Sequence, residues 1–293
     1  MNNMYVLLAI FNDVFKTYLD SLKRDLGGEG FKMILILTLL AWAGIAIVLW
    51  LAISGGFQMP TDPLFYLFWF ALTLLTEISF TLFLLGMLNT SFFAASSLGV
   101  ISSAVTAVYA ALFLGERYLP IQIAAVCISA IGSVLFLRRE GLTNHVHNNK
   151  GVILVLLSVL LTPLELIFYK AATLHTASYQ QFLTGRLVMD LTFYTFFFVI
   201  VSTFWFRNNP FPHITSLVDS RVGVTFLVGT TIMELLDSWL IFKIPISLFT
   251  ILGTLSVPTA YFIGVNKYGE KENLRNICGS ILIVVGVVMF LLK

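Results

Sequence analysis

Charged residues are scarce in this chain. Lys and Arg together number 17 and Asp and Glu number 15 among 293 residues, so only 11% of the chain is charged, whereas soluble domains average about 25%. Hydrophobic residues make up 58%. This composition excludes an ordinary soluble domain and predicts an integral membrane protein.

Cysteine and histidine are also rare, with two and four copies. Cys127 and Cys278 both fall in apolar runs, where a disulfide framework is not expected. His145 and His147 lie in a polar linker with no further ligand nearby, which is a poor metal site. We therefore expect no metal ion and no cofactor.

Several sequence signals of other function classes are missing. The net charge is only +2, and no basic stripe or glycine-rich phosphate loop stands outside the apolar runs, which excludes a nucleic-acid partner. Neither HExxH nor GxSxG occurs, so we do not expect an enzyme. The first apolar segment carries Asn12, Asp13 and Lys16 where a signal peptide would be apolar, and we interpret it as a retained first helix.

Long apolar runs are what the sequence does have. A bilayer core requires roughly 20 helical residues, and ten runs reach about that length. The predicted fold class is therefore an all-α integral membrane protein with ten transmembrane helices. The predicted helices span approximately 4–22, 32–53, 64–86, 93–114, 119–137, 151–170, 182–206, 221–242, 246–265 and 274–292.

An internal repeat divides these ten helices into two sets of five. Shifting the chain by 154 residues places SLGVIS (97–102) on ILGTLS (251–256), Gly132 on Gly286 and Lys16 on Lys170. Because five is odd, the second copy must enter the bilayer upside down, as in the inverted repeats of many secondary transporters. We predict a first repeat over 1–140, a polar linker over 141–150 and a second repeat over 151–293.

A short polar turn recurs between the fourth and fifth helices of each half. It reads Gly115-Glu116-Arg117 in the first half and Gly269-Glu270-Lys271 in the second. The glycine is expected to adopt the left-handed conformation that ends a helix. The charged side chains beside it are expected to lie in water at the headgroup level.

These features together resemble a known family. The segments ALFLGERYLPIQIAAVCISAIGSVLF (111–136) and LSVPTAYFIGVNKYGEKENLRNICGSILIVVGVVMF (255–290), with the lysine that ends the first helix of each half, resemble the ten-helix, EamA-like branch of the drug/metabolite transporter superfamily. The resemblance covers essentially the whole chain and implies transport of a small molecule. One departure is Ala104, which stands where the second half has Pro258, so a proline kink is implied only for the second half.

Ionisable side chains inside the apolar runs are the candidate site residues. Each costs at least a few kcal/mol in hydrocarbon, so such groups usually face the bundle interior, a partner or a water-filled cavity. With the third helices aligned at an offset of 157, Glu77 falls on Glu234. The candidates for substrate binding or proton coupling are Glu77, Glu234, Asp237, Glu165, Lys16, Lys170 and Asp13, with Trp239 and Tyr261 as neighbouring aromatic residues.

Two interpretations of these acids stay open. They can form structural ion pairs, for example with Lys16 or Lys170. However, the acids within the runs outnumber the candidate cations, which are Lys16, Lys170 and Arg186 and lie nearer the ends of the runs. Some acids should therefore lack a fixed partner, and a desolvated carboxyl of that kind can exchange a proton or anchor a cationic substrate.

Pro163, two residues before Glu165, indicates either a broken helix at a binding site or a packing kink.

We therefore predict a multi-pass carrier in the cytoplasmic membrane that exports a small polar or amphipathic metabolite in exchange for protons by alternating access. Its partners would be the small-molecule substrate, H+ and the lipid bilayer, with the chain acting as a monomer or homodimer. The alternatives are an uncoupled facilitator, a non-transporting scaffold and an intramembrane enzyme. The substrate itself cannot be inferred from a shared fold.

Overall fold

The computed structural model describes residues 3–26, 44, 50, 58–88, 92–137, 149–205, 221–269 and 272–292, and every regular element within them is a helix. Five segments in this part of the chain are long and apolar enough to cross a membrane, so the fold is all-α with several candidate spans. The helices are α1 (Asn3–Leu26), α3 (Pro63–Leu88), α4 (Phe92–Leu114), α5 (Pro120–Leu137), α7 (Asn149–Leu174), α8 (Tyr179–Trp205), α10 (Arg221–Lys243), α11 (Ile246–Gly253), α12 (Ser256–Tyr268) and α13 (Leu274–Leu291). The five candidate spans are Pro63–Phe83, Lys150–Leu174, Val224–Lys243, Ile246–Tyr268 and Leu274–Leu291.

The predicted helices coincide with the observed ones to within a few residues wherever the structure describes them. The predicted run 32–53 lies outside the described residues except for Gly44 and Trp50, which are helical. The predicted linker 141–150 is described only at its last two residues, which belong to α7.

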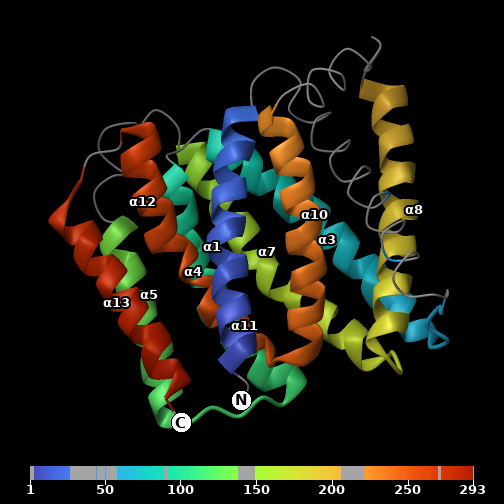
Figure 1. The fold of residues 1–293 in the computed structure, drawn as a ribbon, viewed down its shortest axis with the longest axis horizontal. Coiled ribbons are helices and arrows are strands. Elements are labelled where there is room, and N and C mark those ends of the chain that lie inside the picture. The colour runs from blue at the N-terminus through green and yellow to red at the C-terminus, as the bar shows by residue number, and fades with distance from the viewer. Residues whose placement is uncertain are drawn as a thin grey trace.

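Figure 1 shows an elongated bundle with α5 and α13 together at one end and α8 at the other. Inside it, α1 packs along α10, and α3 packs along α7. Both pairs are antiparallel. In the first, the ring of Tyr5 lies 5.0 Å from that of Trp239, while Lys16 contacts Glu234.

In the second antiparallel pair, Trp69 on α3 contacts Tyr169 on α7, and Ser79 lies 3.0 Å from Ser158 between their hydroxyl oxygens. At the ends of α3 and α7, Asp62 and His175 form a hydrogen bond of 2.8 Å. This hydrogen bond keeps the pKa of Asp62, which precedes the span, below its ordinary value.

The backbones of α5 and α13 approach each other closely, and the contact is reciprocal. A Cβ built on Gly132 would lie 2.8 Å from the carbonyl oxygen of Gly279. A Cβ built on Gly286 would lie 2.7 Å from the carbonyl oxygen of Ala125. The two glycines stand at equivalent positions of the sequence repeat, and so do Ala125 and Gly279. Small residues here let the backbones meet.

The span Ile246–Tyr268 is interrupted at Thr254 and Leu255, which separate α11 from α12. Pro258 has no N–H to donate to the carbonyl four residues earlier, which explains a break at this place. By contrast α4 is continuous through Ala104, as the missing proline implies. The helix α7 is also continuous through Pro163, so the broken-helix interpretation of that proline is wrong.

The turn glycines adopt the predicted conformation. Gly115 has φ 68° and Gly269 has φ 63°, the left-handed region that glycine enters without strain. Arg117 is exposed, as expected for the headgroup level. The other two residues of the second turn, Glu270 and Lys271, lie outside the described residues.

Glu116 does not extend into water as predicted. One carboxylate oxygen accepts the backbone N–H of Ile246 at 2.8 Å, and the other accepts the N–H and the hydroxyl of Ser247. These groups belong to the first turn of α11, whose own N-cap residue, Pro245, makes no side-chain cap. The glutamate of the first half therefore caps a helix of the second half, because free N–H groups at a helix N-terminus attract an anionic acceptor.

Replacing Glu116 with alanine is expected to lower the free energy of unfolding by about 1–3 kcal/mol, because partly buried N–H groups lose their acceptor. Thermal unfolding of the purified protein in detergent would measure this change. The matched control is Arg117→Ala, one residue away and exposed. Equal effects of the two substitutions would show that the cap contributes nothing.

Candidate functional site

A cavity of about 230 Å³ lies in the middle of the bundle, and both halves of the chain contribute to its walls. Acidic side chains face it from α3, α7, α8 and α10, and two cations, Lys16 and Arg186, face it as well. Aromatic and aliphatic side chains make up most of the remaining wall. Its lining includes Lys16, Trp69, Thr76, Glu77, Phe80, Glu165, Tyr169, Arg186, Asp190, Tyr194, Phe226, Glu234, Asp237 and Phe249.

Arg186 on α8 is the most heavily bonded side chain of the cavity. Its guanidinium pairs with Glu234 at 2.8 Å and with Asp190 at 3.3 Å. It also donates to the hydroxyls of Tyr169 and Ser238. The arginine is 4% exposed, so it binds α8 to α10 and α7 from inside the bundle.

Aromatic rings support this arginine. Its guanidinium carbon lies 5.8 Å from the ring centroid of Trp69 and 5.3 Å from that of Tyr169, within cation–π range. Trp69 also donates its indole N–H to Asp190 at 2.7 Å. The rings thus hold Asp190 and Arg186 in place together.

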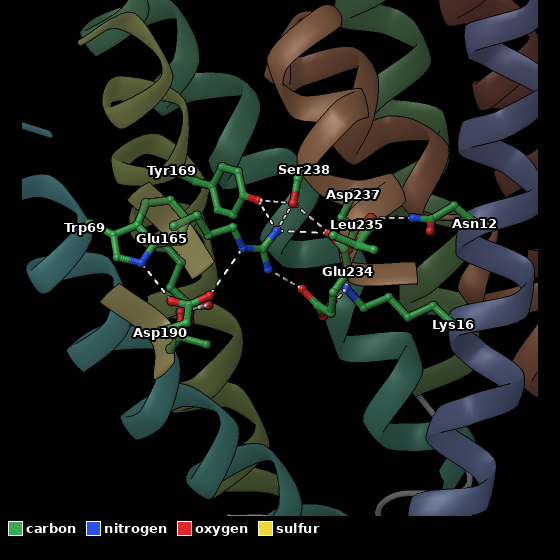
Figure 2. Close-up of polar contacts among 12 residues, drawn as sticks. Asn12, Lys16, Trp69, Glu165, Tyr169, Asp190, Glu234, Leu235, Asp237 and Ser238 are labelled. Carbon is green, nitrogen blue, oxygen red and sulfur yellow. Dashed lines mark hydrogen bonds and ion pairs between the residues drawn. The ribbon is translucent and has the colours of Figure 1, made fainter. Parts of the chain in front are cut away.

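Lys16 on α1 forms the second ionic cluster, on the other side of α10. Its ammonium lies 2.6 Å from Asp237 and 3.6 Å from Glu234. Asn12, one turn earlier on α1, donates its side-chain N–H to Asp237. Glu234 therefore contacts both cations, and Figure 2 shows it beside Lys16.

Two acids of the cavity have no cation. Glu77 on α3 is 7% exposed and makes no hydrogen bond or ion pair with any described residue. It lies close enough to Asp190 and Glu165 for their charges to act on it. Glu165 on α7 accepts a hydrogen bond of 3.3 Å from Thr76 and forms no ion pair with a described residue, and its Oε1 has no donor within the described ranges. The excess of acids over cations predicted such carboxyls.

The structure brings together some of the sequence-predicted site residues. The cavity contains Lys16, Glu77, Glu165, Glu234 and Asp237. Asp13 faces a second, neighbouring cavity instead.

Three other predicted residues lie away from the cavity. Lys170 donates to the carbonyl oxygens of Ile241 and Ile244 at the end of α10. Trp239 packs on Tyr5, and Tyr261 packs beside Val257 and Ile283. Neither Trp239 nor Tyr261 is among the residues that line this cavity, and both side chains pack in contacts between helices.

The candidate list missed Arg186, Asp190 and Trp69. The sequence places Arg186 near a span end because the predicted helix begins at residue 182, whereas α8 begins at Tyr179 and the arginine lines the cavity. The available signal was the spacing of Arg186 and Asp190. They are four residues apart and therefore lie on the same face of a helix. Nothing in the sequence distinguishes Trp69 from the other aromatic residues.

Comparisons with known proteins bear on the fold alone. No family model and no curated protein matches this sequence. Among solved structures 28 chains match. One, a protein solved as a crystal structure, superposes with a TM-score of 0.72 at 13% identity, covering 99% of this chain and 96% of its own. The arrangement of helices thus exists in proteins of known structure, and the described residues form an all-α fold with five candidate membrane spans and a charged interior cavity.

Proposed function

We propose that this protein is a carrier of a small polar or amphipathic metabolite, built from two inverted five-helix repeats and related to the EamA-like branch of the drug/metabolite transporter superfamily. It works by alternating access and exports its substrate across the cytoplasmic membrane in exchange for protons. The observation that carries the proposal is Glu77, a buried carboxyl that faces a central cavity with no bonded partner among the described residues.

The helix contacts support the inverted repeat. If the halves are related by a twofold axis in the membrane plane, exchanging each helix for its equivalent must leave the contacts unchanged. The pair α1 and α10 becomes α7 and α3, which is the other antiparallel pair described above. The pair α5 and α13 maps onto itself, and so does its reciprocal contact of Gly132 with α13 and Gly286 with α5.

The location of the cavity supports transport. In carriers with inverted repeats, the substrate site lies near the midplane between the two halves. Here the walls come from α1 and α3 of the first half and from α7, α8 and α10 of the second. A rocking motion of one half against the other would open such a cavity to either side.

The charges of the cavity support proton coupling. Within the described residues, Arg186 and Lys16 are already paired with Asp190, Glu234 and Asp237. Burial disfavours the charged form of a carboxyl that has no such partner. Glu77 is therefore suited to take up a proton in one state of the carrier and release it in the other.

The test is metabolite profiling of cells that produce the protein and of cells that carry an empty vector, inside and outside, across a set pH gradient. We expect at least one metabolite to be depleted inside and enriched outside the producing cells, more so when the gradient drives protons inward. Identical profiles would contradict the carrier. Export that ignores the gradient would instead favour the uncoupled facilitator.

A further inference from the structure

A second cavity of about 400 Å³ lies beside the first and shares Lys16, Glu165, Glu234 and Asp237 with it. Its remaining wall comes mainly from α1, α3, α4, α7 and α11. Hydroxyl groups are concentrated there, and each brings oxygen lone pairs. The hydroxyl-bearing lining residues are Thr76, Ser79, Ser102, Ser103, Ser158, Thr162 and Thr250.

Three buried oxygens of residues that line this cavity have no donor in the described part of the chain: Oδ1 of Asn12, Oδ2 of Asp13 and Oε1 of Glu165. Asn12 is 2% exposed. Its Nδ2 donates to Asp237, whose carboxylate only accepts, so this contact fixes the orientation of the amide. Oδ1 is therefore an acceptor left without a donor, which folded proteins rarely tolerate.

The charge balance of the second cavity is also incomplete. Asp13 and Glu165 take part in no ion pair within the ranges described, although the charge of Lys16 acts on both. The ammonium of Lys16 is bound at 2.6 Å by Asp237. A buried cavity that contains unpaired oxygen acceptors and acids without a compensating charge favours the binding of a cation.

The turn between α11 and α12 lies beside Asp13. A Cβ built on Gly253 would lie 3.6 Å from Oδ1 of Asp13, so the carboxyl lies against the break. The N–H of Thr254 bonds to Ile251, and the carbonyl of Thr250 accepts the Ser103 hydroxyl instead. The carbonyl end of α11 carries partial negative charge, although Thr254 and Leu255 themselves keep right-handed helical angles.

We propose that the second cavity binds a sodium ion. Its ligands are the Asp13 carboxylate, the Asn12 amide oxygen and hydroxyls from α4 and α11. Hard cations prefer oxygen ligands, and a site made mostly of neutral oxygens with one carboxylate suits a monovalent ion. The inference does not depend on the transported substrate, because the ion can be measured on the resting protein.

The test is thermal unfolding of the purified full-length protein in detergent, with NaCl titrated against choline chloride at constant ionic strength. We expect a saturable, sodium-specific rise in Tm of about 5–10 °C at a hundredfold excess over Kd. Potassium should give a smaller rise. Binding of radioactive sodium by the same samples would give the stoichiometry, expected to be one.

Two variants assign the site. Asp13→Asn should abolish both the sodium-dependent rise and the radioactive binding, while Asp20→Asn, the same change further along α1, should leave both intact. If Asp13→Asn does not fold, Ser102→Ala should weaken the apparent sodium affinity at least several-fold. No sodium effect in the wild type, or an unchanged effect in folded Asp13→Asn or Ser102→Ala, would overturn the proposal and leave water or protons as the occupants.

Discussion

Replacing Arg186 with methionine is expected to lower the free energy of unfolding by about 3–5 kcal/mol, the cost of removing one partner from a buried ion pair. The arginine is 4% exposed and pairs with both Asp190 and Glu234. Without it, Asp190 must stay charged without a cation or become protonated, and Glu234 keeps only its 3.6 Å contact with Lys16 as a described ion pair. Denaturation of the purified protein, followed by tryptophan fluorescence, measures the loss.

Two further variants separate the ion pairs from simple loss of a long side chain. Arg117→Met makes the same change at an exposed position and should have almost no effect. Adding Asp190→Asn to Arg186→Met should restore part of the stability, because one uncompensated acid is removed. A double variant no more stable than Arg186→Met would show that packing, not charge, explains the loss.

Substituting Glu77 with glutamine is expected to abolish the accumulation of substrate driven by a pH gradient, reducing it to the level reached without a gradient. The amide has nearly the same shape but cannot carry a proton between the two sides. Stability should change by less than about 1 kcal/mol, because Glu77 has no bonded partner in the described chain to leave behind. Flux in reconstituted vesicles, with and without the gradient, is the measurement.

The matched control is Glu234→Gln, the same change at the equivalent position of the other half. Glu234 bonds to Arg186 at 2.8 Å, so this variant should lose stability as well as activity. The contrast between the two glutamates is the critical result. Coupled accumulation that survives in Glu77→Gln would refute the role of this carboxyl while leaving the carrier itself open.

Much of the fold could be predicted from the sequence. A membrane-crossing helix needs a long apolar run, and few polar residues interrupt the apolar runs of this chain. The bounds of α3, α4, α5, α10 and α13 follow from such runs. The turn glycines were also predictable, since Gly115 and Gly269 each end a helix where a left-handed residue is favoured. Helix pairing could not be predicted from composition, because lipid-facing and protein-facing sides are both apolar.

The site was harder to predict for the same physical reason. Lys16 and Lys170 hold equivalent positions, yet one pairs with acids and the other with carbonyl oxygens at the end of α10. Trp239 and Tyr261 resemble cavity residues in sequence but fill contacts between helices. Only three-dimensional packing decides which side of an apolar helix faces the interior, so single residues were misplaced even where their helices were right.

The cap that Glu116 provides has a consequence for biosynthesis. The glutamate is translated 130 residues before Ile246, whose N–H it accepts. When α11 forms, its acceptor is therefore already present in the first half. A second half produced alone would begin α11 with unsatisfied N–H groups, so the two halves should recover full stability only when they are made as one chain or expressed together.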